Sequence, residues 1–328
     1  MSNTRNIIRN ATRNISEPLN IITAPTHEAY ETNLTKTNHN FYTIQHPSFK
    51  KWMTQYRPVP NNYYILPDTN LPTHVDFDLV LSQNKFGQYQ ILSDIARQLR
   101  IPIISIEHAL PMPNWDQNTL TQLRNMYGHV NLFISEFSKN AWGFDNIPNS
   151  NVVHHCVDSE LFCPTDIERQ SHILSVVNDW IGRDWCCGFQ SWTRITKDLP
   201  VLPIGDTKGL SKPAKDVDEL VKFYQESQVF INTSTISPIP TALLEAMSCE
   251  CACISTATCM IPEIIEHGVN GLISNNEEEL RHYCQLCLSD KELCRKLGKA
   301  ARQTIIEKFG INKFLATWNR HLFSVLRD

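Results

Sequence analysis

The sequence predicts an α/β protein built from doubly wound domains. Short apolar segments such as 77–82 (FDLVLS) and 101–108 (IPIISIEH) alternate with segments of helical apolar spacing such as 88–100 (QYQILSDIARQLR). Continuous apolar strands that alternate with helices are typical of a parallel sheet covered on both faces. The same alternation begins again after residue 166, and 328 residues are enough for two cores. We therefore expect a first domain over 1–158 and a second over 159–310.

Composition and charge exclude several classes of protein. Hydrophobic residues make up 41% of the chain, and no stretch is long and apolar enough for a membrane-spanning helix. The first residues, MSNTRNIIRNATRNIS, contain no apolar signal region, so we expect a cytoplasmic protein. Residues 1–158 carry 12 basic and 12 acidic side chains, and residues 159–328 carry 18 and 22. Neither part is basic, which argues against nucleic acid as a partner.

Cysteine and arginine form the two most conspicuous local patterns. All 11 cysteines follow residue 155, which favours free thiols in a reducing compartment. CECACIS (249–255) places its cysteines on one face of a strand and RHYCQLC (281–287) places them on a helix, so we expect packing and no metal site. Arg5, Arg9 and Arg13 share one helical face. We interpret them as solvated, and docking on an anionic surface stays open as the alternative.

The carboxyl ends of the predicted strands should line the ligand site, as in other open parallel sheets. The strand 228–234 leads through SPIP into a helix over 240–248 that begins at Pro240. Pro240 sets the first turn, and the free amides of Thr241 and Ala242 together with the helix dipole suit a diphosphate. Glu245 lies a turn and a half further on, where a ribose diol would suit its carboxylate. The alternative is a surface glutamate or one paired with an arginine.

The segments LLEAMSC, PEIIEHGVNGLI and LVKFYQESQVFINTS resemble the donor domain of retaining, family 4-type glycosyltransferases of glycosyl transferases group 1. VNLFISEFSKNAWGF and NVVHHCVDSELFCP resemble the end of that family's first domain. The resemblance implies a GT-B fold, in which two Rossmann-like domains face a central cleft and a final helix, here 311–328, packs back on the first domain. It also implies a nucleotide-sugar donor, no cofactor and no obligatory metal.

Two positions depart from the family pattern. The family has a glutamate eight residues before Glu245, and this chain has Ser237 there. The family's arginine and lysine that contact the diphosphate become Asn178 and Arg183, so one cation remains. Ser237 would take over contacts to the transferred sugar, and Arg183 would bind the diphosphate. A surface arginine beside Asp184 is the alternative reading of Arg183.

The first domain supplies the remaining candidates. His108 resembles the family's histidine at the end of a strand, close to the reacting sugar, and a structural histidine is the alternative. The loop TAPTHEAYE replaces the family's glycine-rich turn. His27, Glu28 and Tyr30 in it are candidates for binding acceptor or phosphate, against a structural loop.

The sequence thus predicts a glycosyltransferase that moves a sugar from a UDP- or GDP-sugar to an acceptor hydroxyl, with retention and without metal. The acceptor is a glycan, a lipid-linked group or a small molecule. Two alternatives stay open. One is a nucleotide-sugar-binding protein that has lost catalysis, and the other is a glycosyltransferase that acts on modified nucleic-acid bases.

Overall fold

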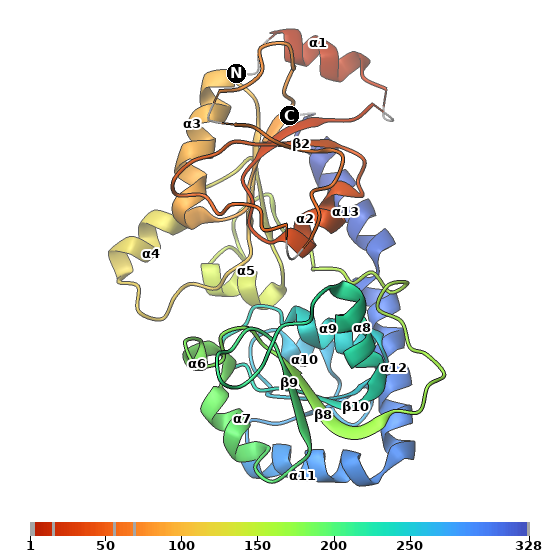
Figure 1. The fold of residues 1–328 in the computed structure, drawn as a ribbon. Coiled ribbons are helices and arrows are strands. Elements are labelled where there is room, and N and C mark those ends of the chain that lie inside the picture. The colour runs from red at the N-terminus through yellow and green to blue at the C-terminus, as the bar shows by residue number, and fades with distance from the viewer. Residues whose placement is uncertain (1–3, 15–16, 55–56, 68–69, 327–328) are drawn as a thin grey trace. The chain divides into compact units, whose positions relative to one another are not determined.

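The computed structural model describes residues 4–14, 17–54, 57–67 and 70–326. The chain forms two compact units, Met1–His154 together with Asn312–Asp328, and His155–Ile311. Both units are α/β with parallel sheets, which confirms the predicted fold class (Figure 1). The predicted boundary at 158/159 lies close to the one between the units. The predicted central cleft stays a prediction.

The sheet of the first unit has seven strands among the described residues, and all neighbours are parallel. Its order is β3 (Tyr63–Ile65), β2 (Asn40–Thr43), β1 (Asn20–Thr23), β4 (Leu79–Ser82), β5 (Ile103–Glu107), β6 (Val130–Phe133) and β7 (Ser150–Val152). The central strands are buried along their whole length, as expected of a sheet with two covered faces.

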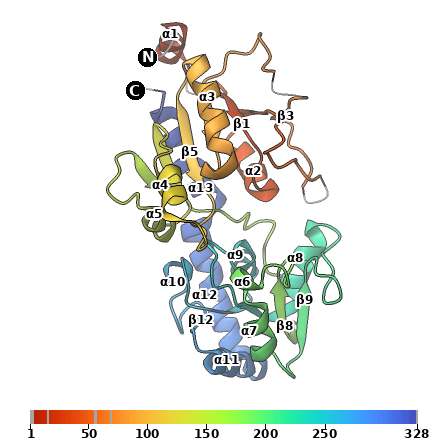
Figure 2. The same cartoon turned by 90° about the vertical axis from the view of Figure 1, so that its left-hand side faces the viewer.

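Helices α2 (Glu28–Thr35), α3 (Gln90–Leu99), α4 (Gln117–Arg124) and α5 (Glu136–Trp142) connect these strands. Figure 2 shows α3 along one face of the sheet. There Leu92 and Ala96 of α3 belong to one buried cluster with Ile22 and Val80 of the strands. The sequence predicts a helix over 116–128 that Gly128 caps, but this is wrong, because α4 ends at Arg124 and its C-cap is Asn125. A Cβ on Gly128 would lie 2.8 Å from the amide nitrogen of Ser105, so close approach to β5 explains this glycine.

The C-terminal helix α13 (Ile311–Ser324) belongs mostly to the first unit and contacts it through aromatic side chains. The indole of Trp318, which is fully buried, donates a hydrogen bond of 3.0 Å to the hydroxyl of Tyr30. Further along the helix, the amide oxygen of Asn319 lies 2.9 Å from the Nε2 atom of His39. A buried indole or phenol is stable only with such a partner, so these contacts fix α13 against α2.

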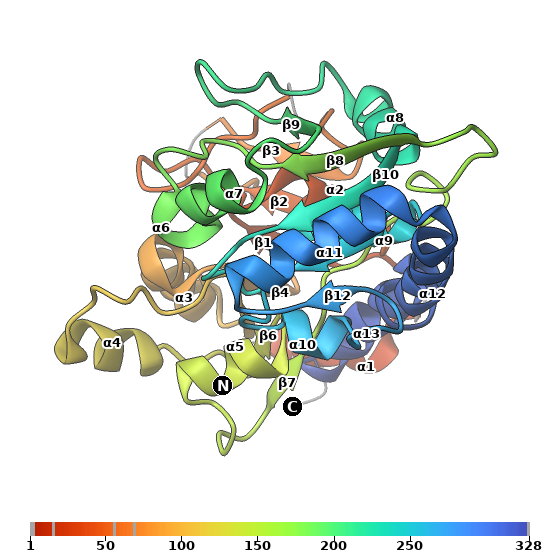
Figure 3. The same cartoon turned by 90° about the horizontal axis from the view of Figure 1, so that it is seen from below.

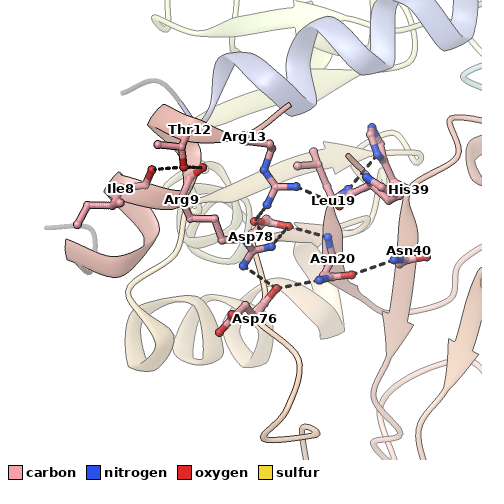
Figure 4. A network of polar contacts seen from close by, with 11 residues as sticks. Ile8, Arg9, Thr12, Arg13, Leu19, Asn20, His39, Asn40, Asp76 and Asp78 are labelled. Atoms are coloured by element: carbon pink, nitrogen blue, oxygen red, sulfur yellow. Dashed lines mark hydrogen bonds and ion pairs between the residues drawn. The ribbon is translucent and has the colours of Figure 1, made fainter. Parts of the chain in front are cut away.

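The N-terminal helix α1 (Thr4–Thr12) is joined to the strands by an ion-pair network (Figure 4). Arg9 lies 2.8 Å from the carboxylate of Asp78, and Arg13 pairs with the same carboxylate. Asp78 is buried and also accepts the amide of Asn20 at the start of β1. The interpretation of these arginines as solvated is therefore wrong for Arg9 and Arg13. The Arg5 side chain lies outside the described residues.

The second unit has a five-stranded parallel sheet in the order β12 (Leu272–Ile273), β11 (Ala252–Ser255), β10 (Ser227–Asn232), β8 (Gln170–Val176) and β9 (Val201–Ile204). Its longer connecting helices are α7 (Phe189–Ile195), α8 (Val217–Glu226), α9 (Thr241–Ser248), α11 (Glu277–Ser289) and α12 (Lys291–Phe309), and the short ones are α6 (Asp184–Cys187) and α10 (Ile261–Ile264). Figure 3 shows α11 lying over the strands of this sheet. The predicted stop of the 261–268 helix at Gly268 is wrong, because α10 ends at Ile264.

The cysteines of the second unit are free, and most are buried. Cys284 and Cys287 of α11 belong to the core that α11 forms with the strands, as predicted for small apolar side chains. Cys249 is the C-cap of α9, and Cys251 precedes β11, so the prediction of three cysteines on one strand face is wrong for both. Among the described residues, no group of His, Cys, Asp and Glu side chains is arranged to hold a metal ion.

Candidate functional site

The loops that follow β8 and β9 are bound to each other at the carboxyl edge of the second sheet. The Asn178 side chain accepts the amide of Asp206 at 2.9 Å, and the amide of Asp179 donates to the carbonyl of Asp206 at 2.8 Å. Gly205 has φ +130°, and a Cβ there would lie 2.0 Å from the Val177 carbonyl oxygen. Only glycine allows this approach, so the two loops have one fixed arrangement.

Hydrogen bonds and a close approach at a glycine also fix the loop that follows β10 to α6. The Thr233 hydroxyl donates to the Cys187 carbonyl at 2.9 Å, and the Thr235 amide donates to the Cys186 carbonyl at 2.9 Å. Gly188, at φ +68°, would place a Cβ 2.3 Å from the Thr233 carbonyl oxygen. The strand ends of β8 and β10 therefore form one hydrogen-bonded platform that leads into α9.

Helix α9 begins at Thr241, and Pro240 is its N-cap, which corrects the prediction of proline as the first helical residue. No side chain caps this end, and the Leu243 and Leu244 amides return to the Pro240 carbonyl. The amides of Thr241 and Ala242 precede the first bond of the helical ladder. An uncapped N-terminus of this kind presents donors and a positive dipole end to an anion.

Glu245 lies on α9 and is half-buried. Its Oε2 atom accepts a hydrogen bond of 2.9 Å from the hydroxyl of Tyr224, which lies on α8. The half-buried side chain and this hydrogen bond contradict the alternative of a surface glutamate. The carboxylate has further lone pairs besides the one that Tyr224 occupies.

Asn178 and Arg183, the predicted diphosphate contacts, lie together. The guanidinium of Arg183 is exposed, and its Nη1 atom is 3.5 Å from the Asn178 carbonyl oxygen. Asp184 accepts from the amide and the side chain of Gln190, at 2.9 and 2.8 Å. Asn178 shapes the β8 loop through its contact with Asp206, and Arg183 is the cation beside that loop.

Ser237 is half-buried in the loop between β10 and α9. Cys259, in the loop between β11 and α10, contacts this loop, and its thiol donates to the Thr235 carbonyl. Burial raises the pKa of the Cys259 thiol, and a hydrogen bond from the Ser237 backbone opposes that shift. Ser237 is thus placed on the platform by its backbone, three residues before the N-cap of α9.

In the first unit, the structure brings His108 and Tyr30 together. Their rings meet edge to face with centroids 4.5 Å apart. The Nε2 atom of His108 is buried, and this burial, with a smaller contribution from His27, lowers the pKa of His108 to about 3. His108 is therefore a neutral imidazole at physiological pH. Tyr30 belongs to the packing of α13, so its hydroxyl has a structural partner in Trp318.

Glu28 has its carboxylate engaged within the first unit. It accepts from the Lys50 ammonium at 2.7 Å and from the Met53 amide at 3.0 Å. Burial would raise the pKa of Glu28, but these hydrogen bonds outweigh it and lower the pKa below its usual value. Glu28 thus ties α2 to residues 50–53. His27, the residue before Glu28, has an exposed side chain.

Two buried acids of the first unit, Glu31 and Glu107, were not predicted from the sequence as candidate residues. Glu31 is fully buried and accepts from the Thr26 amide and from Gln83, at 3.0 and 2.7 Å. Burial raises the pKa of Glu31 to about 8. Glu107 accepts the amides of Lys85 and Ala109, and burial raises its pKa to about 7. The sequence signal for Glu107 was a carboxylate inside the apolar run IPIISIEH.

The chain is similar to known proteins in sequence and in fold. Residues 212–304 match the family model of glycosyl transferases group 1. The matched segment contains α8, β10, α9, β11 and Glu245. The N-acetyl-alpha-D-glucosaminyl L-malate synthase of Bacillus anthracis is 26% identical over 260 residues, which cover 74% of this chain. The match spans only 62% of that relative's length.

Solved structures extend the similarity beyond the group 1 segment. The Anabaena HepE protein in complex with UDP is 14% identical, with a TM-score of 0.73 over 94% of this chain and 100% of that one. Sucrose-phosphate synthase from Thermosynechococcus elongatus is 13% identical, with a TM-score of 0.74 over 93% and 99%. At this identity the likeness shows the fold alone, and the fold is GT-B. None of the helices in the described part of the chain could cross a membrane.

Proposed function

We propose that this protein is a glycosyltransferase that transfers a sugar from a UDP- or GDP-sugar to an acceptor hydroxyl. The observation that carries the proposal is the uncapped N-terminus of α9 with Glu245 just beyond it, inside the group 1 segment. The helix end supplies amide donors for a diphosphate, and Glu245 supplies acceptors for the ribose diol. Structures of Anabaena HepE contain UDP, UDP with glucose, and UDP-glucose, which supports a nucleotide-sugar donor.

Each remaining candidate has a role in this proposal. The amides of Thr241 and Ala242 and the cation of Arg183 stabilise the departing diphosphate as its charge develops. Asn178 holds the β8 loop from which Arg183 extends. Ser237 binds the transferred sugar in place of a carboxylate, through a hydroxyl that both donates and accepts.

The first unit would bind the acceptor. His108, as a neutral imidazole, holds or polarises hydroxyl groups and does not act as a nucleophile. His27 has an exposed side chain, whereas Glu28 and Tyr30 lie on α2 and hold it to Lys50 and to α13. The acceptor is a glycan, a lipid-linked group or a small molecule. The eleven free thiols support a cytoplasmic location.

The resemblance to the family supports transfer with retention, without an obligatory metal and without a cofactor besides the nucleotide-sugar co-substrate. In this scheme the helix amides and Arg183 provide the charge stabilisation that a divalent cation provides in other enzymes. Proton NMR of the product gives the anomeric configuration, and inversion would contradict this part. A tenfold or larger loss of rate in EDTA, restored by Mg²⁺ or Mn²⁺, would contradict metal independence.

A thermal-shift panel of UDP-, GDP- and ADP-sugars tests donor binding. A ligand at 100 times its Kd stabilises the folded state by about 2.7 kcal/mol, so the correct donor should raise the melting temperature measurably. Glu245→Ala should reduce the shift, because the contacts to the ribose are lost while those to the diphosphate remain, and Glu278→Ala on the exposed start of α11 is the matched control. If no nucleotide sugar raises the melting temperature, the proposal is wrong.

One alternative has an observation in its favour. A nucleotide-sugar-binding protein without catalysis would fit Ser237, because the family's first carboxylate is absent there. Such a protein would give the same thermal shift but release no nucleoside diphosphate above the background rate. A glycosyltransferase acting on modified nucleic-acid bases would also have to bind DNA, and a salt-sensitive gel shift tests this.

A further inference from the structure

Tyr224 places a buried hydroxyl against the carboxylate of Glu245. The Tyr224 side chain is completely buried, and its hydroxyl donates to Glu245 Oε2 at 2.9 Å. Burial raises the pKa of Tyr224 well above its usual value, and the charge of Glu245 adds to the shift. The phenol therefore stays protonated and can act as a donor to the carboxylate throughout the working pH range.

The guanidinium of Arg169 holds the backbone of Tyr224 in place and also binds α9. The Nη1 atom of Arg169 donates to the Tyr224 carbonyl at 3.1 Å and to the Ser227 carbonyl at 2.7 Å. The other terminal nitrogen of the same guanidinium donates to the carbonyl of Cys249, the C-cap of α9. Arg169 thus joins the C-terminal ends of α8 and α9. With both backbones fixed, the phenol hydroxyl contacts α9 at Glu245.

The hydrogen bond from Tyr224 would affect how Glu245 binds the ribose of a nucleotide. An ionised carboxylate only accepts hydrogen bonds and offers about four lone-pair sites on two oxygens. A donor on Oε2 restricts the rotation of the side chain, and a carboxylate that accepts one donor can accept others as well. The vicinal hydroxyls of a ribose supply two donors at fixed spacing. A carboxylate that is already oriented loses less conformational entropy when these donors bind.

We propose that Tyr224 is a positioning residue that orients Glu245 and thereby makes the site select ribose over deoxyribose in the nucleotide. The inference rests on the proposed function, because it assumes a nucleoside diphosphate on α9. Tyr224 touches no part of the nucleotide in this scheme and acts through Glu245. Its effect should therefore appear in the recognition of the sugar hydroxyls and not in the binding of the diphosphate.

Calorimetry with four protein variants and two pairs of ligands tests this. The variants are wild type, Tyr224→Phe, Glu245→Ala and the double variant, and the ligands are UDP, GDP and their 2′-deoxy counterparts. In the wild type the ribonucleotide should bind more tightly than its deoxy form. Tyr224→Phe should raise the Kd of the ribonucleotide roughly tenfold, a coupling typical of residues in contact. The Kd of the deoxynucleotide should change less than about twofold. In the Glu245→Ala background, Tyr224→Phe should have no further effect.

The controls separate positioning from packing. Tyr283→Phe makes the same change on α11, where the ring contacts His267, and should leave every Kd unchanged. Melting temperatures of the unliganded variants show that Tyr224→Phe is folded at the assay temperature. Equal weakening of ribo- and deoxynucleotides by Tyr224→Phe, or no weakening at all, would overturn the inference and leave the proposed function standing. A wild-type protein that binds neither UDP nor GDP would overturn both.

Discussion

The guanidinium of Arg9 lies 2.8 Å from the carboxylate of Asp78 and so links the N-terminal helix to the residue before β4. Arg13, whose side chain is almost fully buried, pairs with the same carboxylate. Removing one partner of a buried pair leaves an uncompensated charge, which costs about 3–5 kcal/mol. The N-terminal segment is therefore part of the stable fold of the first unit.

Asp78→Ala should lower the stability of the first unit by about 3 kcal/mol, because it leaves Arg13 buried without its counter-ion. Urea unfolding followed by tryptophan fluorescence measures the change. Asp94→Ala is the matched control, because Asp94 pairs with Arg97 on the surface. That pair should contribute less than about 1 kcal/mol. Equal effects of the two substitutions would contradict the structural role of the network.

Glu31 should make stability depend on pH. Its pKa is raised to about 8 in the folded chain, so the folded state keeps a proton that the unfolded state loses above about pH 4.5. Stability should then be highest below that value and fall as pH rises towards 8, by at most about 1.4 kcal/mol per pH unit. Glu31→Gln should flatten this decline and raise stability at pH 8. Glu136→Gln, an exposed glutamate of α5, should leave the decline unchanged.

Arg169→Lys should weaken donor binding although Arg169 touches no ligand in the proposed site. A lysine cannot reproduce the fork that reaches carbonyls of both α8 and α9, and each lost hydrogen bond from a charged group costs about 1.5–3 kcal/mol. The melting temperature should fall and the KM for the donor should rise. Arg295→Lys on the exposed face of α12 is the control. An unchanged melting temperature would show that Arg169 does not join the two helices.

His108→Asn should reduce kcat roughly 10- to 100-fold with little change in the KM for the donor, because an electrostatic contact to the reacting groups is lost. His108 titrates with a pKa of about 3, so it should contribute no inflection to the pH profile between 5.5 and 8. His282→Asn on α11 is the control. An inflection near pH 6.5 that His108→Asn removes would show that the histidine is ionised during turnover.

The sequence predicts the strands that are buried and continuous, and it fails where structure depends on distant partners. β5 and β10 follow directly from apolar runs. β2 and β3, before residue 75, were not predicted from the sequence. Strands of four and three residues at the edge of a sheet leave little apolar pattern. Gly128 was read as a helix cap, although its role is a close approach to a neighbouring strand.

The candidate site shows the same limit. The position of Glu245 on a helix after an apolar strand follows from local pattern and resemblance. Its contact with Tyr224 does not, because that residue lies 21 positions away along the chain. Glu31 was missed for the same reason, since its partner Gln83 lies 52 positions along the chain. Such contacts form only when the sheet brings separate loops together.

Release of nucleoside diphosphate from a nucleotide sugar tests the central claim most directly. The assay compares wild type, Glu245→Ala and the control Glu278→Ala with the donor that gives the largest thermal shift. We expect the wild type and Glu278→Ala to release UDP or GDP well above background, and Glu245→Ala to lose most of that activity. Release at the same rate by wild type and Glu245→Ala would contradict the assignment of α9 as the donor site.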